Sequence, residues 1–462
     1  MRKGTKSDLY DVFETINASS KILKESVCVI DGGWLLHQVQ WPHSKTFRDI
    51  CDLYVSYIHR HFPEAYIVFD GYSNENVAVK TYERFRRNEK NFAPDVNINM
   101  DLMVLLTREK FLANIANKHK FINLLTESLR QSNIHVEVAN GDADTLIVTT
   151  AIELKNRVSK SVVVVGNDVD LIVLLVGLTS PGTIIYFYKM GSGKTESRVY
   201  DTHSNQLFKD FILFVHAFSG CDSTSALFNK GKKRLVKLFL EDAQLTDMIK
   251  PFYSSNSEKR ILYEVAEKII FQLYLSNNTK EQPTTIAELR YYLFNQTIFH
   301  NNKESSLATL PPTQAALLEH TKRVYLQVQE WLGKNMDAEE WGWKRIFQII
   351  MYPVMTTAPP APDVLLEQVR CSCTDCSSSR CTCKKSGIRC TQLCKNCEGN
   401  ACENKAIQPA EQTAEICEEE ENNDELEAEE YLEEESETEE QIEEELDHTN
   451  TAEPMEIDFD NY

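Results

Sequence analysis

Residues 161–175 read SVVVVGNDVDLIVLL, and this stretch decides the fold. Four consecutive valines are typical of a β-strand that is covered on both faces, as strands are in a parallel sheet between helices. The strand runs into Asp168 and Asp170, so two carboxyl groups stand at its carboxyl end. We therefore expect a buried central strand that delivers acidic side chains to one edge of a sheet.

Further strands alternate with helices on both sides of this stretch. The patterns predict a parallel α/β sheet flanked by helices, because strands that alternate with helical segments form βαβ units. Residues 205–350 are expected to be mostly helical. The expected strands are 26–31 (SVCVID), 66–70 (YIVFD), 135–139 (HVEVA), 161–166, 183–189 and 198–200, and the expected helices are 48–62, 117–131 and 144–154.

Other aspartates occupy similar places along the chain. Ligands of open parallel sheets bind at the carboxyl ends of the strands. A single aspartate there is more often a cap or turn residue, but several together repel one another unless a hard cation such as Mg²⁺ neutralises them. Two such ions about 4 Å apart can activate water and stabilise the leaving oxygen of a phosphodiester. The further aspartates are Asp31 in VIDGG, Asp70 in VFDGY, Asp142 and Asp144 in GDADTLI, and Asp222 in FSGCDST.

The order VIDGG, VFDG, GDADT, NDVDLIVLL and GCDST resembles the acidic motif series of the flap endonuclease/XPG group in the PIN-like superfamily. The resemblance covers roughly residues 26–240, with aspartates at 142 and 144 where glutamates are usual in that group. It implies a PIN-like fold and a structure-selective DNA nuclease that uses two Mg²⁺ or Mn²⁺ ions. It also implies that metal ligands or nearby carboxylates are Asp31, Asp70, Asp142, Asp144, Asp168, Asp170 and Asp222.

Two basic segments are candidates for nucleic-acid contacts. Lys80, Arg86 and Arg87 follow Asp70, and by similarity they would grip phosphate from an arch over the metals. A solvated helix face, balanced by Glu83 and Glu89, is the alternative. The second segment resembles the element of these nucleases that holds duplex backbone, and a nuclear-import signal is the alternative there. Its candidate residues are Lys230, Lys232 and Lys233.

Nine of the 13 cysteines crowd into residues 371–402. In a reducing compartment such crowding indicates metal binding. Zinc takes four thiolates, so six terminal and three bridging thiolates would hold about three Zn²⁺ ions. The block resembles the tesmin/TSO1-type CXC domain, which implies DNA binding with Lys384 and Lys385 at phosphate; a structural or protein-contact role stays open. The cysteines are Cys371, Cys373, Cys376, Cys381, Cys383, Cys390, Cys394, Cys397 and Cys402.

Charge is distributed unevenly along the chain. The net charge is −21, but residues 411–462 contain 25 acidic and no Lys or Arg side chains, which leaves residues 1–410 with a net charge of +4. This asymmetry favours DNA, or RNA, as the partner of the folded part. The acidic tail is expected to be disordered and to be able to contact basic proteins. No signal peptide or membrane span is expected, so we expect an intracellular, nuclear protein.

These patterns predict six segments and two kinds of function. The segments are an N-terminal extension (1–25), a nuclease domain (26–240), a helical extension (241–358), a linker (359–370), a zinc-cluster domain (371–404) and an acidic tail (405–462). The first function is a Mg²⁺-dependent, structure-selective DNA nuclease with a zinc-cluster docking module. The alternative is a catalytically inactive PIN-like protein that binds DNA or acts as a chromatin adaptor. The whole arrangement also resembles an uncharacterised family found in animals.

Overall fold

The computed structural model divides the chain into two compact units, Met1–Ala358 and Pro359–Tyr462, which are described separately. In the first unit the structure describes residues 4, 6–17, 21–71, 93–191, 195–275, 283–300, 307–346 and 350–358. In the second it describes residues 370–373, 376–377, 380–386, 388–390, 394–397 and 402–404. Lys80, Arg86, Arg87 and the acidic tail lie outside the described residues.

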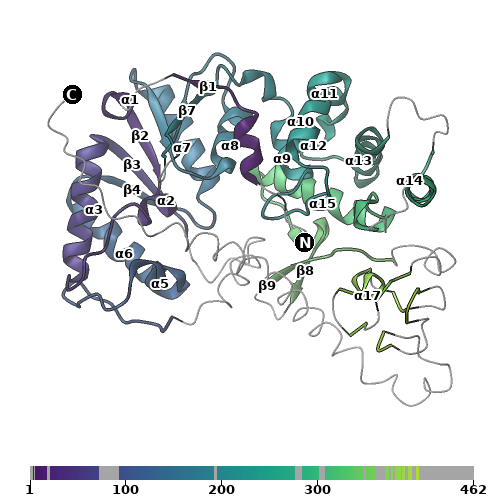
Figure 1. Ribbon diagram of the computed structural model, residues 1–462. Helices are drawn as coiled ribbons and strands as arrows, with labels where there is room; N and C mark the ends of the chain where they lie inside the picture. The colour runs from purple at the N-terminus through teal and green to yellow at the C-terminus, as the bar shows by residue number, and fades with distance from the viewer. Residues whose placement is uncertain are drawn as a thin grey trace. The chain divides into compact units, whose positions relative to one another are not determined.

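A seven-stranded sheet forms the centre of the first unit (Figure 1), and its strand order is β1-β7-β6-β5-β2-β3-β4. Five neighbouring strands run parallel, and β1 and β7 join one edge in the antiparallel sense. The predicted mostly parallel α/β sheet is therefore confirmed. The strands are β1 (Thr15–Ile16), β2 (Val27–Asp31), β3 (Glu64–Phe69), β4 (His135–Val138), β5 (Val162–Val165), β6 (Tyr186–Lys189) and β7 (Arg198–Asp201).

The four valines of β5 enter two different hydrophobic cores, because successive side chains of a strand point to opposite faces. Val162 and Val164 pack with α7 (Asp144–Arg157) and α8 (Val169–Leu178). Val163 and Val165 pack on the other face with α3 (Phe47–His61) and α6 (Ile115–Gln131). Figure 1 shows these helix pairs on the two sides of the sheet. All four valines are buried, as their continuous apolar run predicts.

Local signals set the starts of the long helices. Thr46 caps α3, and Thr46 and Asp49 form a reciprocal capping box that satisfies free backbone amides of the first turn. Asn114 caps α6 through the backbone amide of Asn117. These helices lie within a few residues of the predicted ranges 48–62 and 117–131. Shorter helices of this region are α1 (Lys21–Glu25), α2 (Gly32–Leu36) and α5 (Arg108–Ala113).

The segment before β2 belongs to the same core as the sheet. It begins with the 3₁₀ helix η1 (Lys6–Asp11), continues into β1, and buries Leu9, Tyr10 and Phe13 against α8 and its neighbours. The residues expected to form an N-terminal extension thus complete one edge of the sheet. This placement matters for the site, because η1 carries Lys6 toward the carboxyl ends of the strands.

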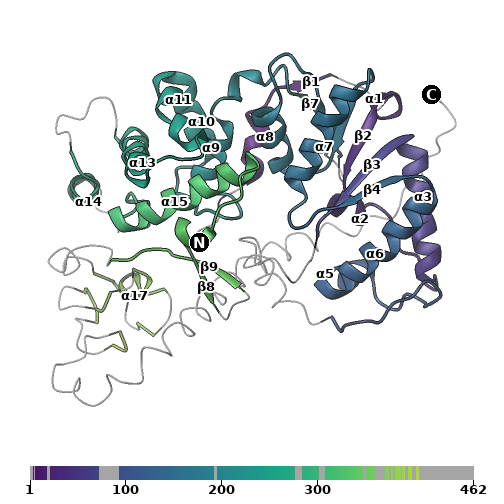
Figure 2. The same cartoon turned by 180° about the vertical axis from the view of Figure 1, so that it is seen from behind.

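The chain after β7 is mostly helical and extends the core that covers α7 and α8. All seven residues of α9 (Ile212–Phe218) are buried, and α15 (Gln314–Trp331) packs against α9 and α13 (Figure 2). An antiparallel hairpin of β8 (Trp343–Ile346) and β9 (Ile350–Pro353) closes this part, although the sequence suggested helix up to residue 350. The other elements are η2 (Gln206–Phe208), α10 (Lys232–Glu241), α11 (Gln244–Met248), α12 (Lys250–Tyr253), α13 (Lys259–Tyr274), α14 (Ile286–His300), η3 (Leu307–Thr309) and η4 (Ala338–Trp341).

The second unit has little regular structure among its described residues. One short helix, α17 (Thr382–Lys385), lies within the cysteine block. Seven of the nine cysteines of the block are buried, and Cys373 and Cys402 are partly exposed. Most of the buried side chains among the described residues of this unit are therefore cysteine thiols. Among all described residues, none of the helices is both long enough and apolar enough to span a membrane.

Candidate metal and nucleic-acid site

Three adjacent strands deliver aspartates to one edge of the sheet. Asp31 ends β2, Asp70 directly follows β3, and Asp168 follows β5 after a two-residue turn. Because β2 lies between β3 and β5, Asp31 is the middle one of the three. Burial raises the pKa of the Asp31 carboxyl to about 7, and the charges of Asp70 and Asp168 add to the rise. The three carboxyl groups are therefore close enough to repel one another.

Asp31 and Asp168 also serve as helix caps. Asp31 Oδ1 accepts a hydrogen bond of 2.8 Å from Gly33 N at the start of α2. Asp168 Oδ1 accepts one of 3.0 Å from Asp170 N at the start of α8. Both aspartates therefore act as helix caps, as aspartates at such positions often do. This capping orients each carboxyl group by one oxygen, which holds the group at the strand end where a cation could reach it.

A glycine allows the ends of β5 and β2 to approach each other. A methyl group in place of the Gly166 hydrogen would lie 2.7 Å from Leu171 Cδ1 and 3.3 Å from Asp31 Cβ. Such contacts would push either Leu171 or the Asp31 side chain away. Gly166 follows β5 directly, so the bare backbone at this point brings Asp168 next to Asp31.

The acidic pair at positions 142 and 144 is tied to Asp70. Asp70 Oδ1 accepts a hydrogen bond of 3.0 Å from Ala143 N, which lies between the two aspartates. Gly71 N donates to Gly141 O at 2.9 Å, so the ends of β3 and β4 are joined at the same place. Asp144 is the first residue of α7. The structure thus brings Asp70, Asp142 and Asp144 to one side of the strand ends.

Asp170 and Asp222 share one ammonium group. Lys6 Nζ lies 3.4 Å from Asp170 Oδ2 and 2.5 Å from Asp222 Oδ1. Burial alone would lower the pKa of Lys6, but the carboxylates of Asp170, Asp222 and Asp168 together raise it above its ordinary value. Lys6 is therefore charged near pH 7, and it neutralises carboxylates that the sequence assigns to a metal.

A buried histidine occupies the other oxygen of Asp170. His216 Nε2 of α9 donates to Asp170 Oδ1 at 2.9 Å. Burial, with the nearby charge of Lys232, lowers the pKa of His216 to about 4, so the ring is neutral near pH 7. Sequence analysis identified neither His216 nor Lys6. The histidine in ILFVHAF reads as a core residue, and Lys6 stands 164 positions from its partner Asp170.

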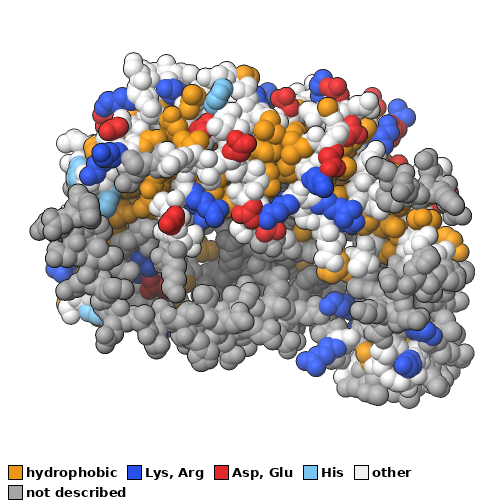
Figure 3. Space-filling model, turned by 45° about the horizontal axis from the view of Figure 1, so that its top comes forward, with side chains coloured by type: hydrophobic (Ala, Val, Ile, Leu, Met, Phe, Trp, Pro, Cys, Tyr) orange, Lys and Arg blue, Asp and Glu red, His pale blue; other side chains and the backbone are white. Residues whose placement is uncertain are grey.

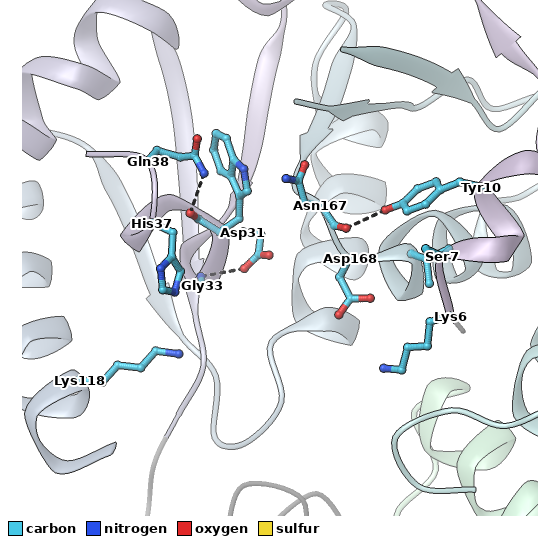
Figure 4. A pocket seen from close by; sticks show the side chains of 12 residues that line it. Lys6, Ser7, Tyr10, Asp31, Gly33, His37, Gln38, Lys118, Asn167 and Asp168 are labelled. Atoms are coloured by element: carbon cyan, nitrogen blue, oxygen red, sulfur yellow. Dashed lines mark hydrogen bonds between the residues drawn. The ribbon is translucent and has the colours of Figure 1, made fainter. Parts of the chain in front are cut away.

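The open part of the site is a pocket of about 570 Å³ at the carboxyl ends of β2 and β5. Figure 4 shows the carboxyl groups of Asp31 and Asp168 in this pocket, with the ammonium groups of Lys6 and Lys118 on opposite sides. Tyr10 OH donates to Asn167 O at 2.9 Å and fixes the turn before Asp168. The pocket therefore brings two carboxyl groups, of Asp31 and Asp168, together with two ammonium groups, of Lys6 and Lys118.

The aspartates do not form the inner sphere of a single ion. Among the described residues, every group of three or more His, Cys, Asp or Glu donor atoms within 4.8 Å of one another consists of cysteines. Mg²⁺ usually keeps several waters and binds through one or two carboxylates. Asp31 and Asp168, which face the same pocket, fit that kind of ligation as oxygen donors.

The basic segment at residues 230–233 contributes less to the surface than its sequence suggests. Lys232 is buried, and its ammonium donates to the carbonyl oxygens of His216 and Gly220 at the end of α9 and to Ser219 Oγ. In this fold the ammonium of Lys232 therefore bonds the end of a helix instead of lying on the surface. Lys230 lies over the ring of Tyr274 at 4.5 Å.

Lys233 keeps an exposed side chain, although it pairs with Asp11 at 2.7 Å. On the face drawn in Figure 3, basic and acidic side chains of the described residues are interspersed rather than separated. In the second unit, Lys384 and Lys385 lie in the last turn of α17, and Lys384 Nζ donates to Ser377 O at 2.8 Å.

The thiols of the second unit form three overlapping groups of four. Each group has all its sulfur atoms within 4.8 Å of one another. Cys371 belongs to all three groups, and each pair of groups shares one further cysteine, which is Cys376, Cys381 or Cys390. Cys394 Sγ lies 3.5 Å from Cys383 Sγ. The groups are Cys371/Cys381/Cys383/Cys390, Cys371/Cys373/Cys376/Cys381 and Cys371/Cys376/Cys390/Cys397.

Comparison with known proteins finds likeness in structure only. No protein-family model matches the chain, and no curated protein matches it. Solved structures similar to this chain include the catalytic core of Rad2 in complex with DNA substrate, at 12% identity over 72% of this chain and 100% of that chain, with a TM-score of 0.33.

Two further similar structures are those of a flap endonuclease and a junction-resolving enzyme. The bacteriophage T5 D15 flap endonuclease, in a complex with DNA and metal ions, has 13% identity over 67% of this chain and 99% of that chain, with a TM-score of 0.34. The eukaryotic junction-resolving enzyme GEN-1 has 13% identity over 71% of this chain and 77% of that chain, with a TM-score of 0.36. These scores are below 0.5, and nothing about the activity of this chain follows from them.

Proposed function

We propose that the first unit is a Mg²⁺-dependent nuclease that hydrolyses phosphodiester bonds of DNA. The observation that carries this proposal is the pocket at the ends of β2 and β5, where Asp31 and Asp168 face Lys6 and Lys118. Carboxylates that bind a hard cation, placed beside an ammonium group such as that of Lys118 that binds phosphate, are what hydrolysis of a phosphate diester needs. Mn²⁺ has the same preference for oxygen ligands and is the expected substitute.

The side chains of the pocket divide the work of such a reaction. A bound Mg²⁺ supplies an activated water and stabilises charge on the phosphate. Asp31 and Asp168 would hold that ion through their carboxylate oxygens, with the caps of α2 and α8 orienting both groups. Lys118 reaches the pocket from the first turn of α6 and would hold a phosphate oxygen. Asp70, with Asp142 and Asp144, would add negative charge beside Asp31 and orient water in the ion's outer shell.

The direct test compares the wild type with Asp31→Asn and Asp168→Asn on flap, duplex and single-stranded DNA, with a single-stranded RNA included. Cleavage that needs Mg²⁺ and disappears in both variants is the expected result. Asparagine keeps the capping hydrogen bonds, so the fold should persist. Undiminished cleavage in the two variants would move the reaction away from this pocket.

A second candidate is a PIN-like protein that binds DNA without cutting it, or a chromatin adaptor. The ion pairs of Lys6 favour this candidate, because they neutralise Asp170 and Asp222 without a metal. The same assay separates the two functions. If the wild-type protein binds DNA but does not cleave it in Mg²⁺ or Mn²⁺, the result would favour the adaptor.

We propose further that the second unit binds three zinc ions and acts as a DNA-docking module in the nucleus. The pairwise sharing of Cys376, Cys381 and Cys390 supports three ions joined by bridging thiolates. Lys384 and Lys385 would then contact phosphate from α17. The acidic tail would be free to contact basic proteins. Charge-reversal of both lysines should weaken binding to duplex DNA at low salt, and unchanged binding would leave the unit a structural or protein-contact role.

A further inference from the structure

Lys6 is the first residue of η1, and two residues that follow it in this helix, Leu9 and Tyr10, are buried in the core. Leu9 of η1 is completely buried, and the neighbouring Tyr10 bonds to the backbone before Asp168. The chain just before Lys6 is equally close to the fold, since a methyl group on Gly4 would lie 3.0 Å from Ala226 Cβ. The segment that follows Lys6 is thus packed into the core through Leu9 and Tyr10, and the ammonium of Lys6 lies within ion-pair distance of Asp170 and Asp222.

That place is between two carboxylates that face little solvent. The side chain of Lys6 is 25% exposed, that of Asp222 20% and that of Asp170 4%. Buried carboxylates of like charge need a counter-ion, because desolvation raises the cost of leaving them unpaired. The ammonium of Lys6 is the described cation that contacts both Asp170 and Asp222.

We propose that Lys6 takes the place of one metal ion, so that the site binds a single divalent cation at Asp31 and Asp168. The inference rests on the proposed nuclease function and refines it. An ammonium group attracts carboxylates as a metal ion does, although with one positive charge instead of two, but it offers only hydrogen-bond donors and cannot coordinate a water oxygen. Lys6 therefore keeps Asp170 and Asp222 together without contributing an activated water.

This arrangement differs from the pair of ions that the sequence resemblance implies. With Lys6 present, Asp170 has one oxygen bonded by His216 and the other by Lys6. A second divalent ion at this place would have to displace the ammonium against two ion pairs and the packing of η1. Replacing Lys6 by an uncharged side chain of similar length should open a second cation site there.

The test counts Mn²⁺ ions bound by the full-length, zinc-loaded protein, using calorimetric titration and Mn²⁺ electron paramagnetic resonance. The acidic tail is present in every variant, so its weak binding is a common background. Wild type is expected to bind one Mn²⁺ that is lost in Asp31→Asn. Lys6→Met is expected to bind two, and the second should vanish in Lys6→Met/Asp222→Asn. Lys233→Met, which removes an exposed ion pair to the same segment, is the control and should bind one.

Each outcome separates this inference from the proposed function. Two ions at the aspartates of the wild-type protein would overturn the inference and leave a metal-dependent nuclease standing. No ion in the wild type would contradict both. If Lys6→Met does not fold, Asp222→Asn alone decides the matter. It should leave the wild-type count at one, because Lys6 and not a metal contacts Asp222, whereas the loss of an ion would overturn the inference.

Discussion

His216 Nε2 donates a hydrogen bond of 2.9 Å to Asp170 Oδ1 and so joins the buried helix α9 to the first turn of α8. Trp331 of α15 stacks on the ring of His216, and the two ring centroids lie 5.6 Å apart. The helical part after β7 therefore supports an aspartate at the edge of the sheet. Asp170 is a structural junction, whichever ion the neighbouring carboxylates bind.

We predict that His216→Phe lowers the free energy of unfolding by about 1–3 kcal/mol, because it removes a donor from a buried carboxylate while keeping a ring against Trp331. Urea unfolding of the wild type and the variant at pH 7.5 measures the difference. His203→Phe, a change at an exposed histidine of the same unit, is the control and should have little effect. An unchanged midpoint for His216→Phe would show that the hydrogen bond to Asp170 contributes nothing.

Substitution of Asp31 and substitution of Asp170 should change the thermal stability in opposite directions. Asp31→Asn is predicted to raise thermal stability at pH 8 without divalent ions, because burial and neighbouring carboxylates make its ionised form unfavourable. The folded-state pKa of Asp31 lies above its unfolded value of 3.8, so the stability that Asp31 contributes is lost as the pH rises through about 7. Asparagine removes this loss and keeps the cap of α2.

Asp170→Ala is predicted to lower stability at the same pH, because it leaves both Lys6 and His216 without this acceptor. Differential scanning fluorimetry of the two variants, in metal-free buffer and in about 5 mM Mg²⁺, would check the sign of both changes in stability. Equal shifts for Asp31→Asn and Asp170→Ala would contradict the distinction between an open and a paired carboxylate.

Much of this site was predictable because it depends on short stretches of sequence. The valines 162–165 predict a strand covered on both faces, and that strand must carry Asp168 to its carboxyl end. The same reasoning places Asp31 after β2 and Asp70 after β3, since parallel neighbours end at one edge. Local patterns therefore predicted the sheet and the grouping of its aspartates.

The partners of these aspartates were not predictable in the same way. Lys6 reaches Asp170 only because η1 packs on α8, and no pattern near residue 6 indicates that packing. Lys232 looks like a surface lysine in a basic run, yet it is buried against the end of α9. Both facts follow from tertiary contacts between distant segments. A charged residue in a sequence can be predicted to pair with a polar or oppositely charged group, but the fold determines which group that is.

Gly166 should be required for the approach of β5 to β2. We predict that Gly166→Ala weakens Mn²⁺ binding at least tenfold and lowers stability by about 1–3 kcal/mol, because the added methyl group meets Leu171 and Asp31. Gly141→Ala is the matched control at the same edge of the sheet, since a methyl group there meets no atom of the described residues within 4 Å. Calorimetric titration with Mn²⁺ gives the affinities, and equal affinities for the two variants would remove the role given to Gly166.

The thiol groups predict a zinc count and a ranking of substitutions. Metal analysis of the full-length protein should find about three zinc ions per chain, as nine thiolates with three bridges require. Cys381→Ser should lose more than one ion because Cys381 belongs to two groups, whereas Cys397→Ser, whose residue belongs to one, should lose at most one. A single zinc ion in the wild type, or identical losses in the two variants, would refute the bridged cluster.

His320 predicts how the first unit responds to acid. Its Nε2 donates to Phe218 O at 3.1 Å, and its buried Nδ1 has no hydrogen-bond partner among the residues that the structure describes. Burial, with the nearby charge of Arg323, lowers the pKa of His320 to about 3, from an ordinary value of 6.5. The folded protein therefore excludes a proton that the unfolded chain binds below pH 6.5.

The stability that neutral His320 contributes is fully present above pH 6.5 and is lost as the pH falls toward 3. One excluded proton corresponds to about 1.4 kcal/mol for each pH unit in this window. We predict that His320→Gln, which can still donate to Phe218 O, removes this slope. Urea unfolding of both proteins at pH 7.5, 6, 5 and 4 gives the difference between their free energies of unfolding. The contribution of His216 cancels in this difference because both proteins contain that residue. The wild type should lose stability relative to the variant at each step below pH 6.5, and parallel curves for the two proteins would mean that His320 takes up a proton without unfolding.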